Sequence, residues 1–319
     1  MTSTTMRAVH VPAAGQGLTL GSAPVPEPQP QQVRIKVEAC GVCHGEAKII
    51  DGWASAYPRI PGHEIVGVID ALGDAVRGWR LGQRVGVGWH GGQGETTGMT
   101  VDGGYAEYTV AREESLVAIP SGMSPEEAAP ILCAGETVFS ALRNSHARIG
   151  DLVAVSGIGG LGHLAIQYAV KAGYEVAAIS RGRDKAHLAR ELGAHHYVDA
   201  EEGVEEQLNE LGGASLIIAT APHADAIKPL LGGLAAGGEL VLAAVSEDPI
   251  GWSALDFLGG QVTVKGTFTD ASAMSDAIDH SILTGVRPRV EVFPLEEAPD
   301  AYQRMMNSDV RFRAVLKVS

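Results

Sequence analysis

Residues 152–180, LVAVSGIGGLGHLAIQYAVKAGYEVAAIS, determine the fold class that we expect for this chain. An apolar run is followed at once by a glycine-rich hexapeptide, then by an amphipathic segment and a second apolar run. Glycines there permit a tight turn and a close approach of a pyrophosphate, and the next helix offers free N–H groups to an anion. The order of these elements predicts a dinucleotide-binding unit rather than a purely structural glycine turn. The residues expected to contact the dinucleotide are Gly157, Gly159, Gly160, Leu161 and Gly162.

From Leu152 onward the chain alternates apolar strands with amphipathic helices. The later strand candidates are HHYVDA, SLIIAT, GELVLAA and VTVKG, and helical segments such as RDKAHLARELG lie between strands. Nearly continuous apolar strands that alternate with helices indicate a parallel sheet covered on both faces. At Ser124, Ser-Pro-Glu-Glu combines an N-cap, a proline at the first helical position and acids in the first turn. We therefore predict an α/β fold with a doubly wound Rossmann-type coenzyme domain over residues 124–266.

The first 120 residues have a different pattern. Short β-branched runs at 33–39, 65–69, 84–87 and 105–110 are separated by glycine and proline, which is typical of an irregular β-rich domain. After the coenzyme domain, a helix over 272–283 and a strand over 313–318 are expected. We place this tail back on the first domain, so residues 1–123 and 267–319 together form a discontinuous catalytic domain.

Composition excludes several classes of protein. A net charge of −14 repels phosphate backbones and anionic lipids, so neither a nucleic-acid partner nor a membrane partner is expected. Three cysteines are too few for a disulfide scaffold or a zinc site with four thiolates. The polar N-terminal segment and the lack of a long apolar run predict a cytoplasmic protein.

The end of the second strand of the dinucleotide unit bears on the choice of coenzyme. An NAD-specific site places Asp or Glu there against the ribose hydroxyls. This chain has Ser180-Arg181-Gly182-Arg183 instead, followed by Lys185. Because serine and arginine bind a phosphate well, we expect NADP(H) rather than NAD(H), with contacts from Ser180, Arg181 and Lys185. The alternative is that the basic residues form only a solvated loop.

Metal-ligating residue types occur in three short segments. They are Cys40-Gly-Val-Cys43-His44, then Pro-Gly-His63-Glu64, and later Leu-Cys133-Ala-Gly. Two thiolates and one imidazole leave one position of a tetrahedral zinc for water or substrate, which is the pattern of a catalytic site. The alternatives are that Cys133 and His63 are ordinary core residues, or that the two cysteines of the first segment form a redox pair.

The order GVCH, PGHE, LCAG, glycine fingerprint and closing RFRAVLKV resembles the zinc-dependent alcohol dehydrogenases of the medium-chain dehydrogenase/reductase superfamily over essentially the whole chain. The resemblance implies a GroES-like catalytic domain, a Rossmann-type domain, an active site in the cleft between them, and a homodimer. It implies that Cys43, His63 and Cys133 are zinc ligands and that Glu64 lies behind the metal or takes a ligand position. It further implies that His44 and Arg313 face the coenzyme pyrophosphate, that Trp89 lines the substrate pocket, and that Cys40 is only packed.

Two departures from the family pattern stand out. Most relatives have a four-cysteine lobe where this chain has residues 90–101 without cysteine, so we expect one catalytic zinc and no structural zinc. After Cys-His the family usually has Thr or Ser and then Asp, whereas this chain has Gly45 and Glu46. Glu46 can supply the carboxylate behind the ligands, but glycine has no hydroxyl with which to transfer a proton. Either water takes that place or the substrate needs no such transfer.

These features favour an oxidoreductase that transfers a hydride between NADPH and an aldehyde or ketone, reversible to alcohol oxidation, with zinc polarising the carbonyl. Gly45 motivates a second hypothesis, an NADPH-dependent reductase of a conjugated C=C or C=N bond on the same scaffold. A third is a catalytically silent NADPH-binding protein, since the fold alone does not fix the function.

Overall fold

The computed structural model describes residues 4–244, 248–267, 269 and 271–319. The chain forms two compact units. One consists of Met1–Cys133, Asp270–Leu283 and Arg287–Ser319, and the other of Ala134–Thr269 and Thr284–Val286. The first unit thus extends to Cys133 rather than to residue 123. The reason is that helix α2 (Pro125–Ala128) packs against strands β3 and β4 of that unit.

Helix α2 begins where the sequence predicts a helix N-terminus. The Ser124 hydroxyl accepts a hydrogen bond from the backbone N–H of Glu127 at 3.2 Å, and the Glu127 carboxylate accepts one from the Ser124 N–H at 3.2 Å. This capping box satisfies N–H groups that have no partner inside the helix. The predicted N-cap is confirmed.

The first unit is built around one mixed sheet with strand order β16-β17-β3-β4-β5-β9, in which β8 also pairs with β3. Its strands are β3 (Gln32–Val42), β4 (Ile65–Leu72), β5 (Arg84–Val87), β8 (Tyr108–Arg112), β9 (Leu116–Ala118), β16 (Val290–Pro294) and β17 (Arg313–Lys317). Two hairpins, β1 (Thr5–His10) with β2 (Thr19–Pro24) and β6 (His90–Gly92) with β7 (Glu95–Thr96), complete its strands. Its helices include α1 (Glu46–Lys48), α9 (Ala271–Thr284) and α10 (Ala298–Met306).

Strand β3 shows why the sequence adopts this sheet. Val33, Ile35 and Val37 are fully buried, while the residues between them are partly exposed. This alternation with a period of two is that of a strand with one face in the core. The C-terminal strand β17 pairs antiparallel with β3. The first and last thirds of the chain therefore share one core.

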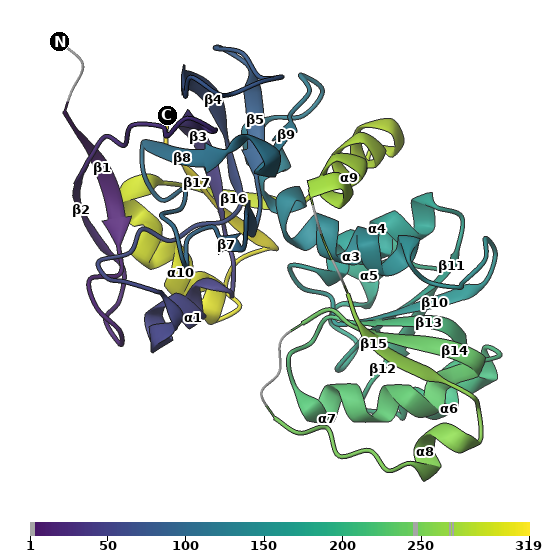
Figure 1. Cartoon of the computed structure of the whole chain (residues 1–319). Coiled ribbons are helices and arrows are strands. Elements are labelled where there is room, and N and C mark those ends of the chain that lie inside the picture. Colours follow the sequence, from purple (N-terminus) through teal and green to yellow (C-terminus); the bar gives the residue numbers. More distant parts are fainter. Residues whose placement is uncertain (1–3, 245–247, 268, 270) are drawn as a thin grey trace. The chain divides into compact units, whose positions relative to one another are not determined.

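The second unit is a six-stranded parallel sheet in the order β12-β11-β10-β13-β14-β15. Its strands are β10 (Leu152–Ser156), β11 (Glu175–Ser180), β12 (His196–Asp199), β13 (Ala214–Ala219), β14 (Leu234–Leu242) and β15 (Thr263–Gly266). Its helices are α3 (Ala134–Arg143), α4 (Gly162–Lys171), α5 (Ala186–Glu191), α6 (Val204–Glu210), α7 (Ala224–Ile227) and α8 (Leu255–Leu258). In Figure 1, α4 and α5 cover one face of the sheet, and α6 and α7 cover the other. This is the strand order of the dinucleotide-binding fold, and the predicted fold class is confirmed.

In the part of the chain that the structure describes, no helix has the length and apolar character needed to cross a bilayer.

Candidate active site

Four residues with metal-ligating side chains meet at one end of the first unit's sheet. Ligand atoms of Cys43, His63, Glu64 and Cys133 all lie within 4.8 Å of one another. The first follows β3 directly, and the next two precede β4. Because β3 and β4 are antiparallel neighbours, the end of one strand and the start of the other lie side by side. Cys133 joins them from the junction between the 3-10 helix η3 (Ala129–Leu132) and α3.

The distance between the two sulfurs fits a tetrahedral zinc ion. The Sγ atoms of Cys43 and Cys133 are 3.9 Å apart. Two thiolates, each about 2.3 Å from a tetrahedral zinc, lie about 3.8 Å apart, whereas a disulfide requires about 2.05 Å. The backbone N–H of Gly45 also donates to the Cys43 sulfur at 3.4 Å, as suits a thiolate. The donor set and its spacing therefore fit zinc and not a disulfide.

Charge within the cluster favours ionisation of one thiol. A hydrogen bond from the Cys133 thiol lowers the pKa of Cys43 well below its usual range, with a smaller contribution from His63, although burial opposes this. The same contact, together with burial, raises the pKa of Cys133. Binding of a soft divalent cation displaces the remaining proton and gives two thiolate ligands.

Glu46 orients two of the ligands from behind. It is fully buried, and its Oε1 lies 2.9 Å from Nδ1 of His63. Its Oε2 accepts a hydrogen bond from the backbone N–H of Cys43 at 2.7 Å. Although burial lowers the pKa of His63, the Glu46 carboxylate raises it well above the usual range. With Nδ1 engaged, Nε2 of His63 remains for a metal ion, as in many carboxylate–histidine–metal arrangements.

Glu64 and Arg313 form a buried ion pair beside the cluster. Both side chains are at most 5% exposed, and Nη2 of Arg313 donates to Oε1 of Glu64. Burial raises the pKa of Glu64 to about 7, although Arg313 lowers it. A Cβ at Gly41 would lie 1.8 Å from Oε2 of Glu64, so only glycine leaves room for the carboxylate there. The structure thus assigns the Arg313 guanidinium to Glu64, and its contact with a pyrophosphate stays a prediction.

The glycine loop of the second unit has the geometry that the sequence predicts. Gly157 has a φ of +96°, and a Cβ at Gly162 would lie 1.8 Å from the Gly157 carbonyl oxygen. Both positions therefore require glycine. The Thr220 hydroxyl, at the end of the neighbouring β13, donates to the carbonyls of Ser156 at 2.8 Å and Gly157 at 3.2 Å. Sequence reasoning missed Thr220 because no motif marks it.

Two protein-family models match two separate parts of the chain. The alcohol dehydrogenase GroES-like domain matches residues 29–121, and the zinc-binding dehydrogenase family matches residues 160–281. The chain belongs to the zinc-dependent alcohol dehydrogenase family. With its zinc site, it is a dehydrogenase that interconverts alcohols and carbonyls with a nicotinamide coenzyme. The hypothesis of a catalytically silent protein is therefore set aside.

The similarity to relatives of known sequence or structure covers nearly the whole dehydrogenase. It is 44% identical to the alcohol dehydrogenase notN of Aspergillus sp. (strain MF297-2), with 95% of each chain covered. It is similar to the Helicobacter pylori CAD complexed with NADP(H), at 26% identity and a TM-score of 0.83, covering 98% of each chain. A solved NAD-dependent alcohol dehydrogenase is also similar, at 26% identity and a TM-score of 0.88, covering 98% of this chain and all of that one. Similarity alone therefore leaves the choice of coenzyme open.

Around the metal ligands, the dehydrogenase places Trp89 and Gly45 close together. The Trp89 ring meets the His63 ring edge-on, with centroids 4.8 Å apart at 89°. A Cβ at Gly45 would lie 3.2 Å from Cε1 of His63 and 3.5 Å from Cζ3 of Trp89. His44, next to them in the sequence, has an exposed side chain. Cys40 is fully buried, and it lies outside the metal-ligating group.

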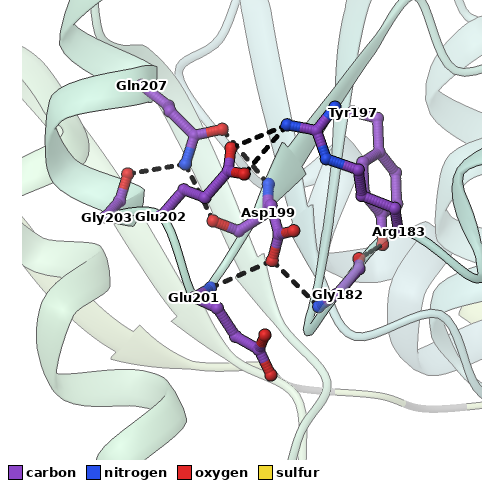
Figure 2. A network of polar contacts seen from close by, with 8 residues as sticks. All are labelled: Gly182, Arg183, Tyr197, Asp199, Glu201, Glu202, Gly203 and Gln207. Carbon is purple, nitrogen blue, oxygen red and sulfur yellow. Dashed lines mark hydrogen bonds and ion pairs between the residues drawn. The ribbon is translucent and has the colours of Figure 1, made fainter.

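The expected coenzyme contacts at the end of β11 are accessible in the dehydrogenase. Arg181 and Lys185 are exposed and Ser180 is half-buried. Nζ of Lys185 lies 3.5 Å from the carbonyl oxygen of Ile158 in the glycine loop. Arg183 behaves differently, because its Nη2 contacts both carboxylate oxygens of Glu202 at 2.9 Å (Figure 2).

Proposed function

We propose that the dehydrogenase reduces aldehydes or ketones with NADPH, and oxidises the corresponding alcohols in reverse. The observation that carries this proposal is the joint presence of a zinc site with two cysteines and one histidine and a second strand that ends in Ser180-Arg181 without an acid. The first suits polarisation of a carbonyl, and the second suits the 2′-phosphate of NADP.

Each residue near the metal has a distinct proposed role. Cys43, His63 and Cys133 hold zinc and leave one position for substrate, while Glu64 remains behind them or takes a ligand position. When bound, zinc supplies Lewis acidity toward the carbonyl oxygen and NADPH supplies the hydride. The Trp89 ring is proposed to form a wall of the substrate pocket.

The coenzyme contacts and the metal content complete the proposal. The glycine loop binds the pyrophosphate together with His44 and Arg313, and Ser180, Arg181 and Lys185 bind the 2′-phosphate. One zinc per chain is proposed, without a structural zinc, because residues 90–101 contain no cysteine. A homodimer is also proposed, with β15, the last strand of its sheet, as the candidate pairing edge.

The test is oxidation of NADPH and of NADH over a panel of aldehydes, ketones and enals, with and without a zinc chelator. We expect turnover of carbonyls, a higher kcat/KM with NADPH, and loss of turnover after chelation. Turnover that survives complete removal of zinc contradicts the metal's role, and a preference for NADH contradicts the coenzyme assignment.

Gly45 is the reason for a second candidate reaction, the reduction of a conjugated C=C or C=N bond. Its lack of a hydroxyl removes the usual proton path of alcohol oxidation. The enal in the panel distinguishes the two reactions, because carbonyl reduction gives an allylic alcohol and alkene reduction gives the saturated aldehyde. A predominantly saturated product replaces the first proposal with the second.

Substitution of Gly45 with threonine tests whether water already transfers the proton. Gly45 has φ −58° and ψ −26°, so a side chain causes no backbone strain there. The three atoms nearest to a Cβ at this position belong to side chains, and Cε1 of His63, at 3.2 Å, would have to shift slightly. If water already fills this role, carbonyl reduction changes less than about tenfold. Gly45→Ala is the matched control, since it adds the Cβ without the hydroxyl. A gain above tenfold in Gly45→Thr but not in Gly45→Ala would show that the hydroxyl is limiting.

A further inference from the structure

We propose that Tyr197 and Asp199 of strand β12 are positioning residues that hold the loop after β11 in the shape required by the 2′-phosphate of NADP(H). We also propose that, of the two arginines in that loop, Arg181 and not Arg183 binds the 2′-phosphate together with Lys185. The inference deepens the proposed NADPH preference and rests on it.

The polar contacts of Gly182 are the basis of this inference. Its backbone N–H donates to Oδ1 of Asp199 at 2.9 Å, and its carbonyl accepts a hydrogen bond from the Tyr197 hydroxyl (Figure 2). Gly182 has a φ of +62°, a left-handed conformation that favours glycine. Both backbone polar groups at the turning point of the loop are therefore held by the neighbouring strand.

The sheet register explains why these two side chains reach the loop. Strands β11 and β12 are parallel, with Ala178 opposite Tyr197 and Ser180 opposite Asp199. Residues two apart in a strand point to the same face, so both side chains meet the loop together. Burial raises the pKa of Tyr197, while a hydrogen bond with Ser180 lowers it. The Tyr197 hydroxyl thus reaches Gly182, two residues after Ser180, which we expect to bind the phosphate.

Asp199 is itself fixed in place. It is 6% exposed, and the same Oδ1 also accepts a hydrogen bond from the Glu201 N–H at 3.0 Å. The Gln207 amide donates to the Asp199 carbonyl at 2.8 Å and accepts from its N–H at 3.2 Å. Because the backbone of Asp199 is fixed at both polar groups, its carboxylate holds the loop in place before a coenzyme binds. This reduces the conformational entropy that the loop loses on binding.

Arg181 and Arg183 differ in whether a carboxylate already pairs with the guanidinium. The exposed side chain of Arg183 forms an ion pair with Glu202 through contacts of 2.9 Å. Arg181 is exposed, and among the described residues no ion pair to it is found. Of these two described arginines, Arg181 therefore offers a phosphate an unpaired guanidinium, whereas binding at Arg183 would compete with its ion pair to Glu202.

The test compares the affinities of 2′,5′-ADP and 5′-AMP by calorimetry, because these fragments differ by the 2′-phosphate and need neither zinc nor substrate. We expect Tyr197→Phe to weaken 2′,5′-ADP binding about fivefold and Asp199→Ala about tenfold, with 5′-AMP changed less than about twofold. Asp199→Asn keeps an oxygen acceptor and should restore nearly wild-type binding. Tyr174→Phe is the matched control, since Tyr174 donates to the Ala147 carbonyl elsewhere in the same unit.

Charge variants test the arginine assignment in the same assay. Arg181→Gln should weaken 2′,5′-ADP about thirtyfold, and Arg183→Gln less than about twofold. The converse result overturns the assignment. Equal losses for both fragments in Tyr197→Phe and Asp199→Ala would show that these residues only support the fold. If wild-type protein binds 2′,5′-ADP no tighter than 5′-AMP, the NADPH preference itself fails. If wild-type protein does prefer 2′,5′-ADP but Tyr197→Phe and Asp199→Ala bind it as tightly as the wild type, the positioning role is wrong and the NADPH preference stands.

Discussion

Replacing Cys133 with serine is expected to lower kcat/KM for carbonyl reduction at least about a thousandfold, because zinc loses a thiolate ligand. The serine hydroxyl is nearly the same size but does not ionise near neutral pH. The 3.9 Å between the Cys133 and Cys43 sulfurs fits two thiolates on one zinc ion. Zinc content, measured by atomic emission on the purified variant, should fall in parallel with activity.

Cys40→Ser is the matched control for this experiment. Cys40 stands three positions before Cys43 in the sequence but is fully buried, and burial raises the pKa of its thiol well above the usual range. The pKa of Cys43 is instead lowered well below the usual range, mainly by its contact with Cys133. We expect Cys40→Ser to keep its zinc and to change activity less than about fivefold, with a stability loss of about 1 kcal/mol. A Cys133→Ser protein that has lost zinc but retains full activity would falsify the metal's catalytic role.

The fold could be predicted from sequence where local pattern and local structure agree. The strands and glycine loop of residues 152–180 follow from apolar runs and from the need for a tight turn, and the structure has them. Strand β5 also has its predicted bounds, Arg84–Val87. The pattern misled at 105–107, because Tyr105 is buried in the core although β8 begins only at Tyr108. Burial of a loop residue mimics a strand signal.

Contacts between distant segments were harder to predict. Of the three proposed zinc ligands, Cys43 and His63 are brought together by the β3–β4 pairing, and Cys133 joins them from the end of η3. Only the order of their motifs made them recognisable from sequence. The pairing of Glu46 with His63 was expected in kind from the resemblance. The hydrogen bonds that Tyr197 and Asp199 form with Gly182 were not expected. No sequence spacing relates the residues after one strand to the side chains of the next parallel strand. Such contacts depend on sheet register, which a single sequence does not reveal.

Removal of the Arg313 side chain is expected to have the largest effect on stability. Arg313→Met leaves the Glu64 carboxylate buried without its partner, and breaking one side of a buried ion pair costs about 3 kcal/mol or more. The double variant Glu64→Gln/Arg313→Met should recover most of that loss, because no unpaired charge remains. Urea unfolding of the metal-free proteins measures the difference without a contribution from zinc binding.

The dependence of this loss on pH follows from the raised pKa of Glu64. Burial holds that pKa at about 7 in the folded protein, above the ordinary value of 4.5, and loss of Arg313 raises it further. In both proteins the folded state binds more protons than the unfolded state once pH exceeds 4.5, so stability falls as pH rises. In the wild type this fall ends near pH 7, whereas in Arg313→Met it continues above pH 7. The deficit of Arg313→Met should therefore be smaller at pH 5 than at pH 8. Arg84→Met, whose ion pair with Glu38 is partly exposed, is the matched control and should lose less than about 1 kcal/mol at either pH. An Arg313→Met deficit as small as that of Arg84→Met, or one that grows toward pH 5, would show that Glu64 is not held as an ion by Arg313.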